Sequence, residues 1–252
     1  MDNETFVQLL NKVNVTADEE QVEQFKQYYE ILVEWNEFMN LTGITEYDEV
    51  LVKHFVDSVA VKKAIVDISK KDTEIGELLN LDTEVSIIDV GTGAGFPGLP
   101  LKIAFPATEV YLLDSLNKRV KFLNEVIGKL SLTGIVASHG RAEDAARQVE
   151  LREHFTMGVS RAVANLATLS EYVLPFVKSG GYFVAYKSGE IDEELESAKK
   201  AIQILGGEVK HVYKFALPDT DIERSFVFIK KTGNTPKKYP RKSGLPGKEP
   251  IK

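Results

Sequence analysis

From Val85 onward, short runs of β-branched and aromatic residues alternate with segments of helical spacing. Seven runs are strand candidates: 85–90, 109–114, 134–139, 155–160, 180–187, 208–217 and 224–231. Helical segments lie between most of them, at 117–131, 165–177 and 192–206. This alternation predicts an α/β fold of the Rossmann-like kind, with a mainly parallel sheet covered by helices on both faces. The last two strands have no helix between them, so we expect an antiparallel hairpin across 218–223.

The residues before Val85 are expected to form helices. Thr16 followed by Glu19 is a capping-box signature. The buried face of the helix that this box starts is predicted from residues at helical spacing: Val22, Phe25, Tyr29 and Leu32. A second helix is expected over 48–67, and the polar residues 69–84 are expected to form a connecting segment.

Three regions follow from these patterns. They are an N-terminal helical extension (1–84), a Rossmann-like core (85–232) and a basic, irregular C-terminal tail (233–252) rich in Pro, Gly and Lys. The net charge of the chain is −7, but residues 230–252 carry +7 and leave −14 for the rest. Local positive charge attracts phosphate, which is typical of a nucleic-acid arm. A merely solubilising tail has the same composition, so charge alone leaves both interpretations open.

The chain contains no cysteine, which excludes disulfides, thiolate zinc sites and a cysteine nucleophile. No apolar run approaches the roughly 18 residues of a membrane-spanning helix. The acidic, polar start of the chain is unlike a secretory signal. We therefore expect a cytoplasmic protein that binds neither a membrane nor a metal.

The stretch "DVGTGAGFPG" (89–98) follows the first strand and satisfies two cofactor templates. Gly93, Gly95 and Gly98 form the G-x-G-x-x-G fingerprint of dinucleotide binding. Gly91, Gly93 and Gly95 form the G-x-G-x-G of nucleoside-cofactor methyltransferases, preceded by the acid Asp89. The next strand ends in another acid, Asp114, which in either class would hold a ribose diol.

Prolines distinguish the two templates. Pro97 and Pro100 lack the amide hydrogens with which a helix N-terminus cradles a pyrophosphate. A hydride-transfer site is also missing, since His139, His154 and His211 are interpreted as surface or packing residues. Asp89 is placed to face either the loop or a cationic ligand. These features favour a sulfonium nucleoside over a dinucleotide.

At this point the chain resembles a family of bacterial methyltransferases, RsmG or glucose-inhibited division protein B, which modify a guanine at N-7 in small-subunit (16S) ribosomal RNA. The matching segments run in order: "WNEFMNLTGIT" (35–45), "HFVDSV" (54–59), "DVGTGAGFPGLPLKIAFP" (89–106), "LLDSLNKRVKFL" (112–123), "GRAED" (140–144), "VSRAVA" (159–164), "AYKSG" (185–189) and the tail to residue 251. The resemblance implies a class I S-adenosylmethionine-dependent methyltransferase with a mostly parallel seven-stranded sheet.

The resemblance also implies the residues that bind the cofactor: Gly91, Phe96, Ala142, Glu143 and Arg161. The glycine loop and the strand-end acid add Gly93 and Asp114. Arg161 would contact the cofactor or the target base, although a surface ion pair is the alternative. One departure is "AYKSG", where Lys187 is kept but Ser188 replaces the glycine that is more usual in the family.

Guanine N-7 carries a free lone pair and no proton, so its methylation needs no general base. The sequence agrees, because "SRAVA" stands where an Asn/Asp-Pro-Pro-aromatic motif would serve exocyclic amines, and pyrimidine C-5 chemistry usually needs a cysteine. We therefore name no catalytic acid or base. His54 and Asp57 lie three residues apart on one helix face. They would either reach a substrate or pair with each other.

The expected partner is small-subunit ribosomal RNA or a partly assembled small subunit, bound by a monomer. The candidate RNA-binding residues are cationic: Lys118, Arg119, Lys187, Lys237, Lys238, Arg241 and Lys242. A small-molecule methyltransferase, an RNA-binding module without catalysis and a dehydrogenase remain as alternatives at this stage.

Overall fold

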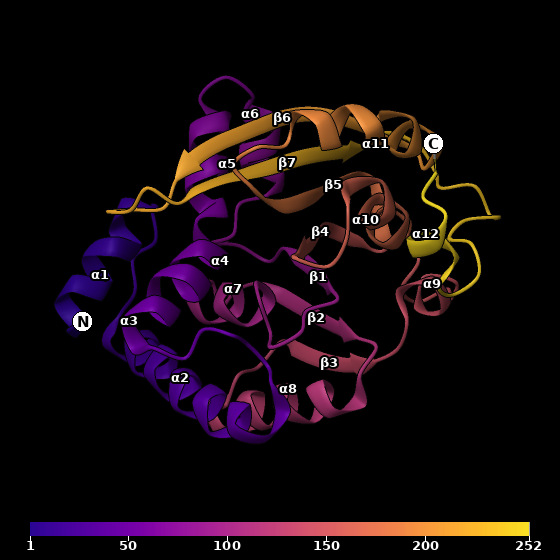
Figure 1. Ribbon diagram of the computed structural model, residues 1–252. Coiled ribbons are helices and arrows are strands. Elements are labelled where there is room, and N and C mark those ends of the chain that lie inside the picture. The colour runs from indigo at the N-terminus through magenta and orange to yellow at the C-terminus, as the bar shows by residue number, and fades with distance from the viewer. Residues whose placement is uncertain (252) are drawn as a thin grey trace.

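A computed structural model describes residues 1–251 and places seven strands in one sheet, in the order β3-β2-β1-β4-β5-β7-β6 (Figure 1). The strands are β1 (Ser86–Val90), β2 (Glu109–Asp114), β3 (Ile135–His139), β4 (Phe155–Arg161), β5 (Val177–Ser188), β6 (Gly207–Ala216) and β7 (Glu223–Lys231). Neighbours from β3 to β5 pair in parallel, whereas β7 is antiparallel to both β5 and β6. The predicted α/β sheet and its terminal hairpin are confirmed.

Successive residues of the strands enter two different hydrophobic cores, one on each face of the sheet. Ile87 belongs to the first core and Ile88 to the second, as expected when side chains alternate across a strand. Helices α7 (Gly98–Ala104) and α8 (Asn117–Lys129) cover the first face, and α10 (Leu166–Val173) and α11 (Asp192–Ile204) cover the second (Figure 1). This two-sided covering is that of a doubly wound α/β fold.

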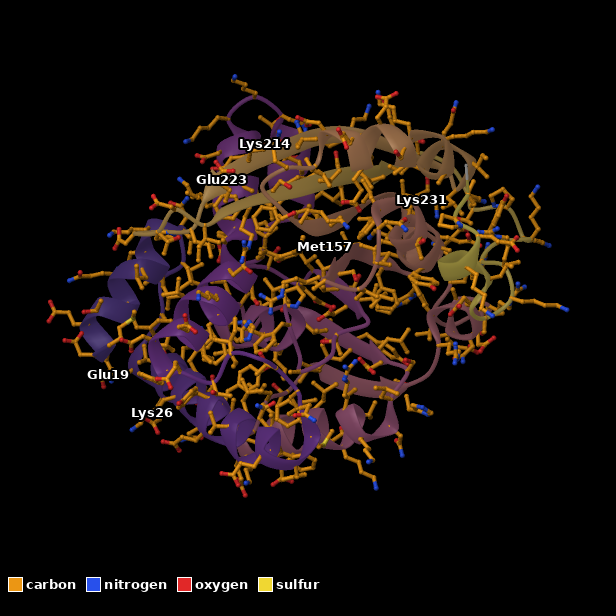
Figure 2. All side chains as sticks on the ribbon, viewed as in Figure 1. Glu19, Lys26, Met157, Lys214, Glu223 and Lys231 are labelled. Atoms are coloured by element: carbon orange, nitrogen blue, oxygen red, sulfur yellow. The ribbon has the colours of Figure 1, made fainter. Side chains whose placement is uncertain are left out.

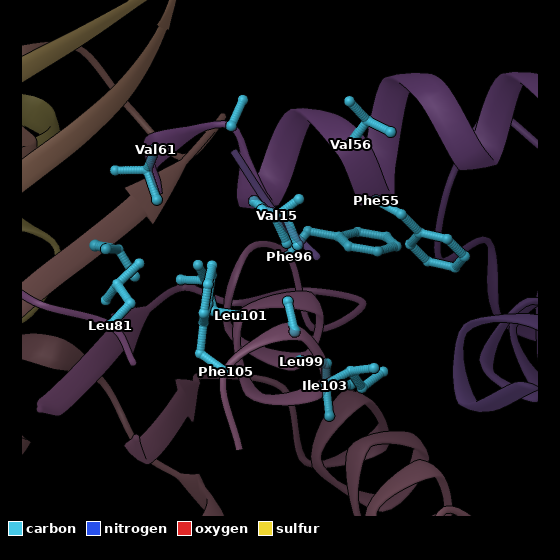
Figure 3. Close-up of a cluster of buried hydrophobic side chains, with 14 of the residues drawn as sticks. Val15, Phe55, Val56, Val61, Leu81, Phe96, Leu99, Leu101, Ile103 and Phe105 are labelled. Atoms are coloured by element: carbon cyan, nitrogen blue, oxygen red, sulfur yellow. The ribbon is translucent and has the colours of Figure 1, made fainter. Parts of the chain in front are cut away.

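The N-terminal helices complete the first face rather than forming a body of their own. They are α1 (Asn3–Lys12), α2 (Glu19–Met39), α3 (Tyr47–Val50), the π-helix η1 (Leu51–Val56), α4 (Asp57–Val59), α5 (Val61–Ser69) and α6 (Thr73–Leu78). Phe55 of η1 and Phe96 of the glycine loop lie side by side in the same buried cluster (Figure 3). The extension is therefore positioned directly against the predicted cofactor loop.

The start of α2 differs from the prediction. Thr16 does not cap it; Asp18 accepts from the amide of Gln21 (2.8 Å), and the Gln21 side chain accepts from the amide of Asp18 (2.9 Å). The capping box is present but begins two residues later than predicted. An Asp–Gln pair satisfies the unpaired amides at the start of a helix as a Thr–Glu pair does. The buried tyrosine on this helix is Tyr28, while Tyr29, which was predicted to face the core, is half-buried.

The helix predicted over 48–67 is an interrupted helical run. It contains the wider π turns of η1 and a single turn residue, Ala60, before α5. The segment 69–84, predicted to be a connection, contains the short helix α6. Its Ile75 is buried, so one apolar position among polar residues is enough to anchor a turn of helix.

The C-terminal tail is mostly irregular, as predicted, but it is docked along its length. Its one helical turn is α12 (Leu245–Lys248), which lies between α9 (Ala142–Ala145) and α10 in Figure 1. Arg152 donates to the carbonyls of Thr235 (2.8 Å) and Tyr239 (3.1 Å) and fixes the first part of the tail.

Charged side chains such as Glu19 and Lys26 lie along the outside of α2 in Figure 2, whereas Met157 lies within the sheet. Lys231 is an exception: it is buried and donates to Glu153 (3.0 Å) and to the carbonyls of Leu174 and Val177. Within residues 1–251, every helix is too short or too polar to cross a bilayer.

Replacing Asp18 by Ala tests the corrected start of α2. We expect Asp18→Ala to lower the free energy of unfolding by about 1 kcal/mol, because an orphan amide of the helix loses its acceptor. For a chain of this size that corresponds to a fall in Tm of about 2–4 °C, measured by circular dichroism. Thr16→Ala is the matched control and should leave Tm unchanged; equal effects of both variants would contradict the assignment.

Candidate functional site

The glycine loop (residues 91–97) is closed by the carboxylate of Asp89 in β1. Its Oδ2 accepts hydrogen bonds from Thr92 Oγ1 (2.6 Å) and from the amide of Gly98 (2.8 Å), the first residue of α7. One carboxylate therefore joins the beginning of the loop to its end. Of the two roles left open for Asp89, this oxygen faces the loop.

Two further contacts hold the middle of the loop. Asp114, at the end of β2, accepts from the amides of Gly93 (2.9 Å) and Leu116 (2.8 Å). The hydroxyl of Tyr28, from α2, donates to the carbonyl of Ala94. The predicted residues Gly93 and Asp114 thus bind each other and shape the loop. Their contact with a cofactor stays a prediction.

The start of α7 offers no amide to a phosphate. The amide of Gly98 is bound to Asp89, and that of Leu99 donates to the carbonyl of Gly95 (2.8 Å). Pro97 and Pro100 have no amide hydrogen. A pyrophosphate cradle needs several free amides at a helix N-terminus. The loop is therefore unsuited to a dinucleotide, as the prolines predicted.

Glycine is required at two positions of this loop for different reasons. Gly91 has φ +72°, and a Cβ there would lie 2.8 Å from Val163 Cγ2. At Gly98 a Cβ would lie 2.9 Å from Asp89 Oδ2 and would displace the carboxylate that closes the loop. The backbone thus approaches Val163 on one side and Asp89 on the other, as only glycine allows.

A cavity of about 420 Å³ lies beside the loop at the carboxyl ends of the strands, and we call it the first cavity. Its lining residues are Val90, Gly91, Leu113, Ser115, Gly140, Arg141, Ala142, Glu143, Val163, Ala164, Thr168, Tyr172 and Gly247. A neighbouring cavity of about 320 Å³ shares four of these residues and extends it over β2 and β3. The structure thus brings three predicted cofactor residues together: Gly91, Ala142 and Glu143.

A second cavity, of about 470 Å³, lies beyond the end of β4 and contains Arg161. Arg161 donates to Asp57 Oδ2 (3.0 Å) and to His54 Nδ1 (3.3 Å), and its guanidinium lies 4.9 Å from the centre of the Phe96 ring. Asp57 also accepts from Arg224 (3.1 Å). His54 and Asp57 therefore do not pair with each other; both orient Arg161.

His54 is neutral in this arrangement. Burial, and then the charge of Arg161, lower the pKa of His54 to about 3. Nδ1 of His54 lies 3.3 Å from Nη2 of Arg161, which can only donate, and 3.2 Å from the carbonyl of Lys53, which can only accept. Nε2 lies 2.8 Å from Thr42 Oγ1. Both ring nitrogens and both oxygens of Asp57 are thus occupied by hydrogen bonds.

The side chain of Phe96 is directed away from the first cavity. Its ring stacks on His54 at 4.5 Å and packs against Tyr28. It also packs against Phe55, beside which it lies in Figure 3. Phe96 thus caps the loop by hydrophobic packing, and a cofactor contact by this residue stays a prediction.

The segment 161–164 forms a wall between the two cavities. Arg161 and Ala162 line the second cavity, and Val163 and Ala164 line the first. Ala162 has φ +57°, an unusual conformation for a residue with a Cβ and one that is enriched at functional sites. Ligands bound in the two cavities would therefore lie next to each other at this short segment.

The predicted RNA-binding cations fall into two groups. Lys118, Lys237, Lys238 and Lys242 are exposed. The others already have partners in the structure: Arg119 with Asp114, Lys187 with Glu194 and Arg241 with Glu171. Contact of either group with RNA stays a prediction.

Sequence reasoning missed Arg224 and Tyr28. Arg224 lies at the start of β7, and an antiparallel strand starts at the edge where parallel strands end. The predicted hairpin could therefore have placed it beside Arg161. Tyr28 had no such signal, because its contact with Ala94 joins segments 66 residues apart.

The strand order, the antiparallel seventh strand and a ligand cavity at the glycine loop after β1 define a class I methyltransferase. A family model described as GidB, rRNA small subunit methyltransferase G, matches residues 21–225. The chain belongs to this family.

Relatives match over almost the whole chain. A protein of Lachnoclostridium phytofermentans named ribosomal RNA small subunit methyltransferase G is 51% identical over 99% of this chain and 98% of its own length. A protein of the same name from Acetivibrio thermocellus is 48% identical over 94% of this chain and 91% of its own length. Fibrillarin from Aeropyrum pernix with bound S-adenosyl-L-methionine aligns at 16% identity and a TM-score of 0.48, over 60% of this chain and 68% of that protein.

The residues of the first cavity fit S-adenosylmethionine, the cofactor of these methyltransferases. The loop has no phosphate cradle, and Gly91 opens its backbone toward the cavity. Asp89 Oδ1 is the one buried side-chain nitrogen or oxygen of residues 1–251 without a hydrogen-bond partner. Asp89 is fully buried and lines none of these cavities, so this oxygen makes no contact with a ligand there. Gly91, Ala142 and Glu143 are the residues that would hold the cofactor, and within residues 1–251 no cluster of side chains is placed to bind a metal.

The titration of Asp89 makes the free energy of unfolding depend on pH. Burial raises its pKa from 3.8 to about 6, although Thr92 and Gly98 oppose the shift. The folded state therefore holds a proton that the unfolded chain has lost, so this residue's contribution to stability falls as pH rises from about 4 to 6. We expect a loss of roughly 2 kcal/mol between pH 4.5 and 7.5 from this one group.

Asp89→Asn keeps an acceptor oxygen for Thr92 and Gly98 but cannot titrate. Urea unfolding at both pH values should show the stability of the variant rising relative to the unmodified protein as pH increases. Parallel pH profiles for the two proteins would contradict the shifted pKa.

Proposed function

We propose that this protein transfers the methyl group of S-adenosylmethionine to N-7 of a guanine in small-subunit (16S) ribosomal RNA. The observation that carries the proposal is the near full-length match, at 51% identity, to a protein named ribosomal RNA small subunit methyltransferase G. The two cavities on either side of residues 161–164 supply a place for each reactant.

Bound in the first cavity, S-adenosylmethionine supplies a methyl group on a sulfonium sulfur. The contribution of the chain is to orient the reactants. Gly91, Ala142 and Glu143 fix the donor, and Arg161, held by Asp57 and His54, positions the target base in the second cavity. Holding two reactants in line contributes roughly 7–11 kcal/mol to lowering a barrier.

The second cavity is suited to a nucleophile that needs no base. His54 is neutral with both nitrogens occupied, Asp57 is bound to two arginines, and Glu194 is paired with Lys187 at 2.6 Å. A substrate hydroxyl or amine would find no free carboxylate or imidazole to take its proton. Guanine N-7 has a lone pair and no proton to lose, so this arrangement supports it as the target.

The substrate is proposed to be ribosomal RNA or a partly assembled small subunit, reached by a cytoplasmic monomer. The exposed lysines 118, 237, 238 and 242 are the cations available for phosphate. A guanine within folded RNA must be exposed before transfer, at a cost of a few kcal/mol. RNA shape in a ribosomal particle would lower that cost.

The decisive experiment uses a radiolabelled methyl donor with small ribosomal subunits that lack the modification. After digestion to nucleosides, the label is expected in 7-methylguanosine. Label in another nucleoside would contradict the N-7 target, and no label in RNA would favour a small-molecule substrate or a binding module. Equal transfer to protein-free RNA would contradict recognition of the particle.

In the same assay Arg161→Ala should reduce the rate roughly a hundredfold, because the target base loses its positioning group. Arg161→Lys keeps the charge but not the planar fork that joins Asp57 to His54, and should recover little of the rate. Full activity of either variant would show that Arg161 does not position the target base.

The tail lysines are tested by the salt dependence of RNA binding. For Lys237→Ala/Lys238→Ala, the slope of log K against log salt concentration should fall by roughly 1–2, because two phosphate contacts are lost. Lys70→Ala/Lys71→Ala, near the end of α5, is the control of equal charge. An identical slope for both double variants would show that the tail does not contact RNA.

A further inference from the structure

The C-terminal tail reaches the first cavity and forms part of its lining. Gly247 of α12 is one of the lining residues, and Pro246 accepts at its carbonyl from Thr168 Oγ1 (3.1 Å), another of them. In Figure 1 this end of the tail lies against α10 and α9, the two helices that flank the cavity. The segment predicted to be an RNA arm is therefore also adjacent to the cofactor site.

The tail is bound directly to a predicted cofactor residue. The amide of Gly244 donates to Glu143 Oε1 at 2.7 Å, and Glu143 is 4% exposed. The other carboxylate oxygen, Oε2, has no hydrogen-bond partner among residues 1–251, and unlike Asp89 Oδ1 it is not fully buried. Glu143 lines the first cavity. One oxygen of Glu143 thus fixes its orientation while the other is available to a ligand.

A buried ion pair holds this part of the tail in place. Glu171 of α10 is fully buried and accepts from the backbone amide of Arg241 (2.7 Å) and from its guanidinium (2.7–3.1 Å). The same guanidinium donates to the carbonyl of Glu249 (2.7 Å), just after α12. Arg241 therefore fixes both ends of the turn that presents Gly244 and Gly247.

We propose that residues 241–248 form a wall of the donor site and that the Gly244 amide positions Glu143 to accept hydrogen bonds from the donor nucleoside. The inference rests on the proposed function, because it assigns that donor to the first cavity. Adenosine presents hydroxyl and amine donors, and a carboxylate with one oxygen already held binds such donors in a defined direction. Arg241 acts through the tail and is a positioning residue, not a catalytic one.

The consequence is that the affinity for the donor depends on the docked tail in the absence of RNA. Titration calorimetry with S-adenosylhomocysteine measures this directly. We expect Arg241→Ala to weaken binding roughly tenfold, the effect of one charge-assisted hydrogen bond. In transfer assays the KM for the donor should rise while kcat is kept. Lys200→Ala removes an exposed cation of α11 that lines neither cavity, and it should bind as the unmodified protein does.

A double-mutant cycle identifies the path through Glu143. Glu143→Gln keeps an oxygen for the Gly244 amide but replaces the free acceptor by an NH₂ group, so it should also weaken donor binding. If the tail acts through Glu143, adding Arg241→Ala to Glu143→Gln should cause little further loss. Additive effects would show that the tail and Glu143 act independently, and would overturn the positioning role.

Limited trypsin digestion of the unmodified protein gives a readout that needs no variant. S-adenosylhomocysteine should slow cleavage after Lys242 and Lys248, since it completes the contact between tail and cavity. Unchanged cleavage with bound ligand would overturn the inference. Absence of any S-adenosylhomocysteine binding by the unmodified protein would instead contradict the proposed function, so the two failures are distinguishable.

Discussion

The closure of the glycine loop by Asp89 is the interaction on which the rest of the site depends. Its carboxylate joins Thr92 at the start of the loop to Gly98 at the start of α7, in a position without solvent. Because the Gly98 amide donates to Asp89, the N-terminus of α7 has no free amide with which to bind a phosphate. The cavity is therefore suited to a ligand that has no phosphate. The same closure presents the Ala94 carbonyl to Tyr28, and so docks α2 onto the sheet.

The second cavity depends on Arg161 in a comparable way. Its guanidinium joins segments that are distant in sequence, the run 54–57 of the N-terminal helices and the end of β4, while Asp57 links both to Arg224 at the start of β7. Breaking such a buried pair by removing one partner costs about 3–5 kcal/mol, because the remaining charge stays uncompensated. The N-terminal extension is thus needed for the geometry of the site as well as for covering the sheet.

Local patterns and a family resemblance were enough to predict the sheet, the terminal hairpin and three residues of the first cavity. A strand of this sheet can be predicted from the sequence because its successive side chains, such as Ile87 and Ile88, enter opposite hydrophobic cores. Contacts between distant segments have no such signature. The pairing of Arg241 with Glu171 spans 70 residues, and composition predicts only an irregular basic tail there. The predicted start of α2 was two residues too early because Thr16 and Asp18 are both good N-cap residues. Only packing decides between them.

The docking of the tail explains how an acidic body holds a basic segment. The surface that receives it is acidic: Glu143, Asp144 and Glu171 bind Gly244, Ser243 and Arg241 respectively. Arg241 is consumed in this docking, whereas Lys237, Lys238 and Lys242 remain exposed on the outer side of the same segment. A polyanion that binds these lysines would hold the tail in place, and Gly247 of the tail lines the first cavity. Because binding free energies are reciprocal, a donor that favours the docked tail would in turn favour the binding of a polyanion to these lysines.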